Sequence, residues 1–286
     1  MCIRDRYKIW YDKPASYWEE ALPIGNGRIA AMVFGDPQLE QIQLNEETVS
    51  AGSPYQNYNE EAKAALPEMR RLIFEGKYEE AQNMAATKIL SQVGNEMPYQ
   101  TVGRLNIRYQ DHKKVSNYYR DLDISNAMTV TRYKVDGVEF TEETFASFTD
   151  QLVIRHIKSS KPGAINCELF FNTPMRDPKR SIYGKKGLRL EGITHGSRYF
   201  PGKVHYCADL DVKNKGGEVT MANDTLLSVQ GASELTLYIS MATNFVNYKD
   251  ISGDPYQRNK TYLKNAEKEY DLSLIHISEP TRLGMI

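Results

Sequence analysis

The sequence predicts a mainly β protein built as a large antiparallel β-sandwich, a super-sandwich, with a short helical insertion. Three observations predict this fold. Short segments of alternating polar and apolar residues recur along the chain, turn residues separate them, and a single internal stretch carries helical periodicity. Strands with few helices between them favour antiparallel sheets over βαβ units. A length of 286 residues allows one large domain or two modest ones.

Ten strands are expected from these alternating segments. The clearest pair is TVTRYKV and VEFTEETFAS, which are joined by Asp136 and Gly137. An Asp-Gly pair accepts the positive φ angles of a type I′ turn, so these two segments predict a β-hairpin. The expected strands are 28–34, 39–45, 129–135, 138–147, 151–159, 164–172, 186–194, 204–213, 225–231 and 234–242.

A helical insertion lies at 59–90, where the pattern predicts helices at 59–66, 67–76 and 77–90. Pro67 lacks a backbone N–H, so we expect it to begin the second of these helices at its first turn. Gly76 is placed to end that helix. The apolar residues of the third helix fall on one face, which predicts core packing. They are Tyr78, Ala81, Ala85 and Ile89.

The composition excludes several classes of function. Lys and Arg total 36 against 37 Asp and Glu, so no basic excess favours nucleic acid. No apolar run approaches the roughly 18 residues of a membrane helix, and the first residues do not form a signal peptide. The cysteines Cys2, Cys167 and Cys207 lack CxxC spacing, and the histidines lack the i, i+4 spacing of a helical metal site. No metal, no cofactor and no membrane partner is therefore predicted.

The two ends of the chain differ in pattern from what adjoins them. MCIRDR at 1–6 and the segment 272–286 resemble translated adapter sequence, and we expect neither to belong to the natural protein. Ordinary disordered tails are the alternative. The last periodic segment, TYLKNAEKEYD at 261–271, predicts the first turns of a helix. The expected organisation is therefore a β-sandwich domain over 7–258, followed at 259–271 by the start of a helical linker.

The stretch LNEETVSAGSP at 44–54 places two carboxylates side by side, at Glu46 and Glu47. Adjacent residues of a strand point to opposite faces of the sheet. The two carboxylates of a glycosidase flank one bond, about 5 to 9 Å apart, so this local pair is not a catalytic dyad. Either residue could still pair with a distant carboxylate.

Two further segments carry candidate binding residues. Gly25-Asn26-Gly27 suggests a phosphate loop, but a β-branched run rather than a helix follows it, which favours a tight turn that leads into a strand. EGITHGSRYFPG at 191–202 gathers Gly, His, Arg and aromatic residues in a loop. That loop either stacks a sugar on Tyr199 or Phe200 or packs between strands.

Several stretches together resemble the opening of glycoside hydrolase family 95, the α-L-fucosidase family. They are WYDKPASYWEEALPIGNGRIAAMVFGDPQLEQIQLNEETVSAGSP (10–54), RRLIFEGKYEEAQ (70–82), MPYQTVGRLNIRY (97–109), YYRDLDISNAMTVTRYKVDGVEFTEETFAS (118–147) and ATNFVNYKDISGDP (242–255).

This resemblance implies an N-terminal β-sandwich, a helical linker, a catalytic (α/α)6 barrel and a further β-domain. Such enzymes invert configuration with a Glu acid and with Asn and Asp residues that activate water, all of them in the barrel. This chain would then hold no catalytic residue, and it would be inactive alone. Its expected partners are the barrel, packed against it in the same molecule, and a fucosylated glycan reached through that barrel. Family members that act on host or plant glycans are exported, so a secreted or periplasmic location is expected.

Under this resemblance, 45–54 is expected to be a loop that faces the barrel and shapes its mouth. The candidate mouth or interface residues are Asn26, Asn45, Glu46, Thr48 and Tyr55. The chain departs from the family at Val49 to Pro54, where VSAGSP stands in place of LWSGGP. The missing Trp puts sugar stacking by this loop in doubt.

Three alternatives remain. A stand-alone carbohydrate-binding module would need an exposed aromatic platform, for which the candidates are Tyr55, Tyr58, Tyr199 and Phe200. The same domain also fits an α-L-galactosidase, because relatives in the family act on α-L-galactosides. A purely structural domain would present an apolar face to its barrel.

Overall fold

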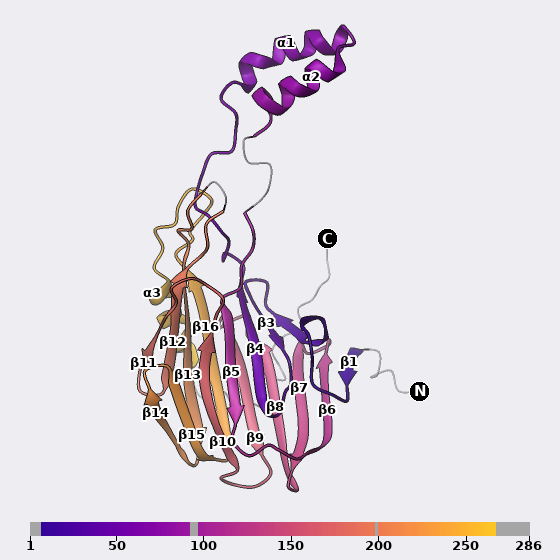
Figure 1. Ribbon diagram of the computed structural model, residues 1–286. Helices are drawn as coiled ribbons and strands as arrows, with labels where there is room; N and C mark the ends of the chain where they lie inside the picture. Colours follow the sequence, from indigo (N-terminus) through magenta and orange to yellow (C-terminus); the bar gives the residue numbers. More distant parts are fainter. Residues whose placement is uncertain (1–6, 92–96, 198–199, 267–286) are drawn as a thin grey trace.

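The computed structural model describes residues 7–91, 97–197 and 200–266, which form two antiparallel sheets packed face to face (Figure 1). The expected mainly β, antiparallel sandwich is therefore confirmed. The segments 1–6 and 272–286 lie outside the described residues.

One sheet has nine strands in the order β1-β6-β7-β8-β9-β16-β13-β12-β11. These strands are β1 (Lys8–Tyr11), β6 (Val115–Asp123), β7 (Met128–Val135), β8 (Val138–Ala146), β9 (Leu152–Ser159), β16 (Glu234–Thr243), β13 (His205–Lys215), β12 (Gly187–Ile193) and β11 (Lys179–Tyr183).

The other sheet has seven strands in the order β14-β15-β10-β5-β4-β3-β2. These strands are β14 (Glu218–Asn223), β15 (Leu226–Ala232), β10 (Ile165–Asn172), β5 (Gly103–Tyr109), β4 (Leu39–Glu46), β3 (Ile29–Val33) and β2 (Leu22–Gly25).

All ten predicted strands are present, with ends that differ by at most two residues from the prediction. The turn between β7 and β8 has φ of 48° at Asp136 and 83° at Gly137, as the Asp-Gly pair predicts. Strands β1, β2, β5, β6, β11 and β14 were not predicted.

The apolar core fills the space between the two sheets. Along β4, Ile42 and Leu44 point into the core and are fully buried, while Gln41 and Gln43 on the opposite face are partly exposed. This alternation follows from the two-residue period of a strand. Strand β9 lies at the centre of the nine-stranded sheet and is buried at almost every position.

The core also holds a charged group between the sheets. Arg155 of β9 donates from Nη2 to Glu40 of β4 at 3.1 Å and to Glu142 of β8. Glu142 Oε1 accepts from the hydroxyls of Tyr109 at 2.5 Å and Tyr133 at 2.7 Å. Buried charges are tolerated only when they are paired and hydrogen-bonded, and each of these carboxylates has several donors.

Helix α3 (Pro255–Ala266) packs across β16 and β13, on the outer face of the nine-stranded sheet. Asn259 is fully buried there; it accepts from Ser240 Oγ at 2.7 Å and donates to the Cys207 carbonyl at 3.0 Å. Leu263 joins a second apolar cluster on the same face.

The helical pattern was expected to begin at Thr261, and α3 begins six residues earlier. Asp254 Oδ1 accepts from the backbone N–H groups of Tyr256 at 2.9 Å and Gln257 at 3.1 Å. An Asp cap followed by Pro255 at the first helical position is a strong start signal.

The helical insertion contains α1 (Ala62–Phe74), α2 (Tyr78–Met84) and a π-helical turn at Ala85–Ile89. The predicted helix start at Pro67 is wrong, because Pro67 lies inside α1. It removes one hydrogen bond, to the carbonyl of Lys63, and both residues are exposed, so water can satisfy that carbonyl.

Gly76 ends α1 as predicted. Its φ is +75°, its N–H donates to the Ile73 carbonyl at 3.1 Å, and the N–H of Lys77 donates to the Leu72 carbonyl at 2.9 Å. This pair of bonds is a Schellman motif.

The predicted core packing of the third helical segment is wrong for most of its face. Ala81 is buried, but Tyr78 is 69% exposed and Ala85 and Ile89 are partly exposed. The reason is visible in Figure 1, where α1 and α2 extend away from the sandwich.

Cys167 and Cys207 are both buried and free, and Cys2 lies outside the described residues. Among the helices that the structure describes, none is both long enough and apolar enough to span a membrane.

Candidate functional site

The candidate residues from the sequence lie around the end of the sandwich where β4 stops and the chain leaves for α1 (Figure 1). The turn between β2 and β3 lies at the same end, because Ile29 at the start of β3 pairs with Glu46 at the end of β4. The structure links Asn26, Glu46 and Thr48 through hydrogen bonds, whereas Asn45 and Tyr55 lie outside that network.

Arg28 is at the centre of the network, and the sequence reasoning missed it. Its Nη1 lies 3.2 Å from Glu46 Oε1 and donates to the Met241 carbonyl of β16 at 2.8 Å. Its Nε donates to Gln151 Oε1 at 2.6 Å, and its guanidinium stacks 4.8 Å from the ring centre of Tyr262. Arg28 therefore joins the seven-stranded sheet to the nine-stranded sheet and to α3. A lone Arg after a Gly-Asn-Gly turn is a weak signal in the sequence, because its partners are distant.

Glu46 is 4% exposed, and its second oxygen is also satisfied. Oε2 accepts from the backbone N–H of Thr48 at 2.7 Å and from its hydroxyl at 2.6 Å. That hydroxyl also contacts the Thr243 hydroxyl of β16. Burial raises the pKa of Glu46, while the bonds from Thr48 and the charge of Arg28 oppose the rise. Both carboxylate oxygens thus bind protein groups.

Glu47 is exposed, so the two carboxylates point to opposite sides. That they do not flank one glycosidic bond stays a prediction. Asn45, the residue before Glu46, is half-buried on the outer side of β4.

Asn26 fixes the turn that precedes β3. Its Oδ1 accepts from the N–H groups of Arg28 at 3.0 Å and Ile29 at 2.9 Å, and its Nδ2 donates to the Ser147 carbonyl at 2.8 Å. Gly27 beside it has φ of +96°. These contacts support the tight-turn interpretation over a phosphate loop.

The loop after Glu46 is fastened to its neighbours by backbone hydrogen bonds. Gly52 donates to the His195 carbonyl at 3.1 Å and accepts from the N–H of Lys203 at 2.9 Å. Ala51 donates to the Pro98 carbonyl at 2.9 Å. The loop therefore has a fixed shape, with Val49 and Ala51 buried beneath it.

A cleft of about 640 Å³ opens between this loop and the segments near 97, 204 and 245–251. Its size lies within the range of about 300 to 1,000 Å³ that small-molecule sites occupy. Its lining residues are Glu47, Thr48, Ser50, Ala51, Ser53, Pro54, Tyr55, Asn57, Met97, Val204, Phe245, Tyr248 and Ile251.

The ring of Tyr55, which lines this cleft, stacks on Phe200 with ring centres 4.3 Å apart and planes at 30°. Each ring therefore covers one face of the other. Tyr58 is 63% exposed, and Tyr199 lies outside the described residues. Tyr55 and Phe200 thus pack on each other rather than side by side as two open platforms.

The chemistry available in the cleft is limited. Among the described residues that line it, Glu47 is the single carboxylate, whereas glycoside hydrolysis needs two. Over the residues that the structure describes, no three His, Cys, Asp or Glu side chains gather as a metal site. The described residues of the cleft can bind or pack against a surface, but they do not supply a hydrolytic pair.

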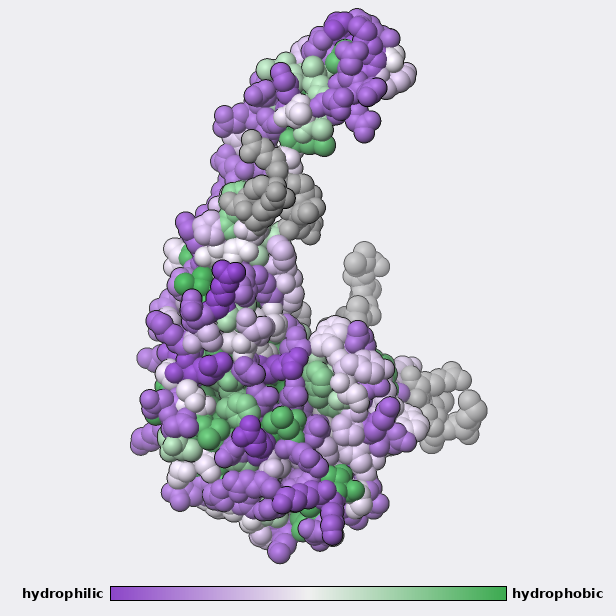
Figure 2. All heavy atoms as spheres, in the orientation of Figure 1, coloured by the Kyte–Doolittle hydropathy of each residue, from purple (hydrophilic) through white to green (hydrophobic). Residues whose placement is uncertain are grey.

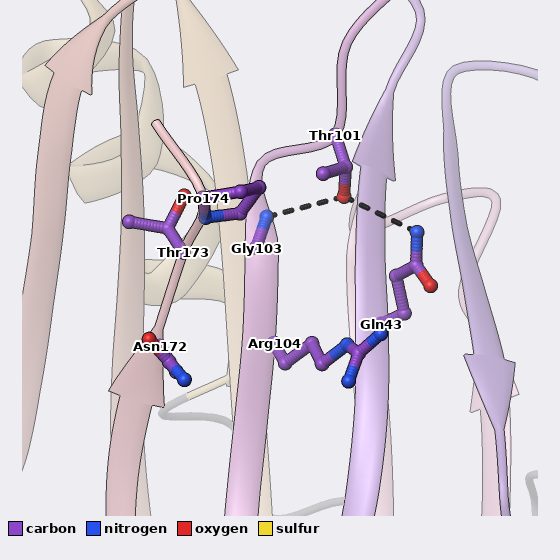
Figure 3. Close-up of a pocket in the computed structure, with 7 residues that line it drawn as sticks. All are labelled: Gln43, Thr101, Gly103, Arg104, Asn172, Thr173 and Pro174. Atoms are coloured by element: carbon purple, nitrogen blue, oxygen red, sulfur yellow. Dashed lines mark hydrogen bonds between the residues drawn. The ribbon is translucent and has the colours of Figure 1, made fainter. Parts of the chain in front are cut away.

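A smaller hollow of about 280 Å³ lies on the outer face of the seven-stranded sheet (Figure 3). Gln43 of β4, Arg104 of β5 and Asn172 of β10 surround it, and Thr101 Oγ1 accepts from Gln43 Nε2 at 3.5 Å. The sequence did not predict this hollow. The polar residues come from three strands that are distant in the chain.

Two of the described histidines, His112 and His156, are buried and contact neighbouring residues of the sheets. His112 is buried, stacks on Tyr109 with ring centres 4.3 Å apart, and lies 3.0 Å from the Pro37 carbonyl. His156 Nδ1 lies 3.0 Å from Thr236 Oγ1. Burial lowers the pKa of both His112 and His156. Cys207 donates its S–H to Asp209 Oδ1 at 3.5 Å.

Comparison with known proteins gives matches to carbohydrate-active enzymes. A family model described as glycosyl hydrolase family 65, N-terminal domain, matches residues 9–248. Alpha-L-fucosidase 2 of Arabidopsis thaliana is 31% identical over 261 residues, and the match covers 83% of this chain and 30% of that protein. Probable alpha-fucosidase A of Aspergillus oryzae is 22% identical over 260 residues, and the match covers 87% of this chain and 35% of that protein.

Among solved structures, a putative kojibiose phosphorylase from human microbiome superposes with a TM-score of 0.50 at 11% identity. The match covers 96% of this chain and 37% of that one, and it shows a shared fold. The chain thus spans about a third of the length of these relatives.

Proposed function

Because this chain belongs to the family of glycosyl hydrolase family 65 N-terminal domains, we propose that it is the non-catalytic β-sandwich of a longer α-L-fucosidase-like enzyme. In that enzyme, the sandwich supports a catalytic (α/α)6 barrel that hydrolyses terminal α-L-fucosyl linkages with inversion of configuration. This chain alone is inactive.

One observation carries the proposal that the chemistry lies elsewhere. At the end of the sandwich where the candidate residues meet, Glu46 has both oxygens bound by Arg28 and Thr48. Glu47 is then the single carboxylate among the described residues that line the cleft. A glycosidase needs an acid and a base across one bond, so the second group must come from another part of the protein.

The fucosyl specificity is supported by the names of the relatives. Two proteins that match more than four fifths of this chain are named as α-fucosidases. The relatives are much longer than the matched part, which fits a domain that precedes the catalytic one. An α-L-galactoside is the alternative substrate, because both sugars share the L-galacto ring configuration.

The proposed role of the 45–54 loop, together with Tyr55 directly after it, is to shape the barrel's mouth. Its backbone bonds to the 97–101 and 194–204 segments give it a fixed form before a partner binds. Thr48 and Tyr55 face the cleft. Glu46 and Asn26 lie at the base of this loop, and their hydrogen bonds fix the position where the loop begins. We place the intact enzyme outside the cytoplasm, where its glycan substrates are found, and assign it no cofactor.

A stand-alone carbohydrate-binding module is the second candidate. The observation that favours it is the aromatic lining of the cleft by Tyr55, Phe245 and Tyr248, the last of which is 73% exposed. Aromatic rings with polar neighbours are suited to the apolar face of a sugar. The stacking of Tyr55 on Phe200 weakens this candidate, since it removes one ring face.

The proposal is tested by hydrolysis of an aryl α-L-fucoside. We expect no turnover by this 286-residue chain and turnover by the longer product of the same gene. An aryl α-L-galactoside assayed in parallel separates the two substrates. Turnover by this chain that is lost in Glu47→Gln would place the chemistry in the cleft and overturn the proposal.

A further inference from the structure

The helical insertion forms an arm, which we define as residues 59–90. It leaves the sandwich beside the cleft and extends beyond the loops of that end (Figure 1). Helices α1 and α2 and the following π-helical turn make their main contacts with one another, not with either sheet. The arm is therefore a two-helix unit without a surface of the sandwich to pack on.

The arm has almost no core of its own. Its buried residues are Ala65, Leu72 and Ala81, and two of these three side chains are single methyl groups. Isolated helices shorter than about 12 to 15 residues are marginal in water, and most helix stability in proteins comes from packing of an apolar face. Helix α1 has 13 residues and α2 has seven. The arm needs another surface to hold this shape.

The apolar residues that this surface would cover are found at the tip of the arm. Phe74 ends α1 and is 89% exposed, while Ile73 beside it is 41% exposed. Tyr78 begins α2 on the other side of the Gly76 turn. The Schellman motif fixes how the two helix ends are joined, and these three exposed residues flank the turn. We call them the tip of the arm.

Charged groups surround the tip. Arg71 donates to Glu68 at 2.5 Å and also to Glu75, and Lys77 lies 3.0 Å from Glu75. Such exposed ion pairs add little stability, but they place a charged rim around an apolar centre. That arrangement is typical of protein–protein contact sites. Figure 2 shows that the surface of the arm is largely hydrophilic.

We propose that the arm docks its tip, made of Ile73, Phe74 and Tyr78, onto the C-terminal part of the same polypeptide. The inference rests on the proposed function, which makes this chain one domain of a longer enzyme. The match covers 30% of the Arabidopsis protein and 35% of the Aspergillus oryzae protein, so most of the length of each lies outside it. Within one polypeptide a partner surface is present at high effective concentration, so a small apolar tip suffices.

The position of the arm also supports docking of its tip onto the C-terminal part of the same polypeptide. The strand-end loop that lines the cleft through Ser53, Tyr55 and Asn57 leads directly into α1. A domain that covers the cleft therefore also approaches the base of the arm. The tip then contacts that domain at a second place, which is distant from the contact at the cleft.

The test is hydrogen exchange of the arm, measured by mass spectrometry in this chain and in the longer product of the gene. We expect amides of 62–84 to exchange at least tenfold more slowly in the longer protein than in this chain. The double variant Phe74→Ser, Tyr78→Ser should abolish that protection. Lys63→Ser with Glu79→Ser is the matched control, since both residues are exposed on the same arm, and it should leave the protection unchanged.

A second variant is needed because the two serine substitutions could unfold the helices of the arm. Phe74→Arg keeps a good helix former at an exposed position, and it should also abolish the protection. Equal exchange of the arm in the two proteins would overturn the inference. A dimer of this chain by sedimentation, with a slowly exchanging arm, would assign the tip to a second copy and also overturn it.

Hydrolysis of the aryl α-L-fucoside by the longer product separates this inference from the proposed function. If the longer product is active but its arm is not protected from hydrogen exchange, only the docking inference is wrong. If the arm is protected but the longer product cleaves neither the fucoside nor the galactoside, the docking inference stands and the proposed function is wrong.

Discussion

The carboxylate of Glu46 lies 3.2 Å from Nη1 of Arg28, and the same nitrogen donates to a backbone carbonyl of the opposite sheet. This relationship separates the roles of the adjacent residues Glu46 and Glu47. Glu46 neutralises an arginine that joins the two sheets, and Glu47 next to it lines an open cleft. The pair thus divides into a structural carboxylate and a surface one.

Glu46→Ala should lower the free energy of unfolding by about 2 to 4 kcal/mol, because it leaves Arg28 without its acidic partner. Glu47→Ala is the control and should change it by less than about 0.5 kcal/mol, as expected for an exposed position. Urea denaturation of this chain measures both. Equal effects of the two substitutions would contradict the assignment.

The same substitution tests catalysis in the longer enzyme. Glu46→Ala should leave substantial turnover, with its loss confined to stability and substrate binding. A fall in kcat of about 10⁴-fold at a temperature where the variant is folded would mean that Glu46 takes part in the chemistry.

Glu40 should make stability depend on pH. Burial, together with the nearby charge of Glu142, raises the pKa of Glu40 to about 7 from an ordinary value of 4.5, although Arg155 and two backbone N–H groups oppose the rise. The folded protein then holds a proton between these values that the unfolded chain releases. The stabilising contribution is complete below pH 4.5 and is lost as the pH rises through 7.

The measurement is urea denaturation of wild type and Glu40→Gln at several pH values from 5 to 8. The difference in unfolding free energy between the two proteins should change across this range by up to about 3 kcal/mol. A constant difference would show that Glu40 stays ionised throughout, held by Arg155.

Asn259→Ala should loosen α3 from the nine-stranded sheet. The substitution leaves the Ser240 hydroxyl and the Cys207 carbonyl without their buried partner, which costs about 1 to 3 kcal/mol. Hydrogen exchange of 255–266 should quicken while exchange in β9 stays slow. Gln257→Ala, on the exposed side of the same helix, should change neither. No change in α3 exchange would mean that Leu263 and its apolar neighbours suffice to hold the helix.

A fucosylated oligosaccharide should not bind this chain with a Kd below about 1 mM. Tyr55 and Phe200 cover one face of each other, and the remaining lining of the cleft is largely apolar. Titration followed by NMR measures the affinity. A tighter Kd that is lost in Tyr55→Ala and kept in Tyr58→Ala would favour the carbohydrate-binding module.

The strands were predictable because their signal is local. The two-residue alternation of β4, and the Asp136-Gly137 turn with its positive φ angles, need no knowledge of distant residues. The missed strands lack that signal; β11, for example, is mostly exposed at the edge of its sheet and has no alternating apolar face.

The site was less predictable, because its contacts join residues that are far apart in the chain. Glu46 and Thr48 were named from the sequence, but Arg28, which pairs with Glu46 and reaches Met241, was not. The burial of Arg155 between Glu40 and Glu142 was not predicted for the same reason, because Glu40 is distant from Arg155 in the chain. The break expected at Pro67 failed for a different reason, since one lost hydrogen bond on an exposed helix is tolerated.

The central claim is that this sandwich belongs to a longer hydrolase whose chemistry lies in a following domain. Sequencing the source DNA past the codon for Asp271 tests it most directly. We predict a reading frame that continues through a linker helix into a helical barrel with the acidic and amide residues of a hydrolase. An in-frame stop codon soon after Asp271 would contradict the claim, and the carbohydrate-binding module would then be the better account.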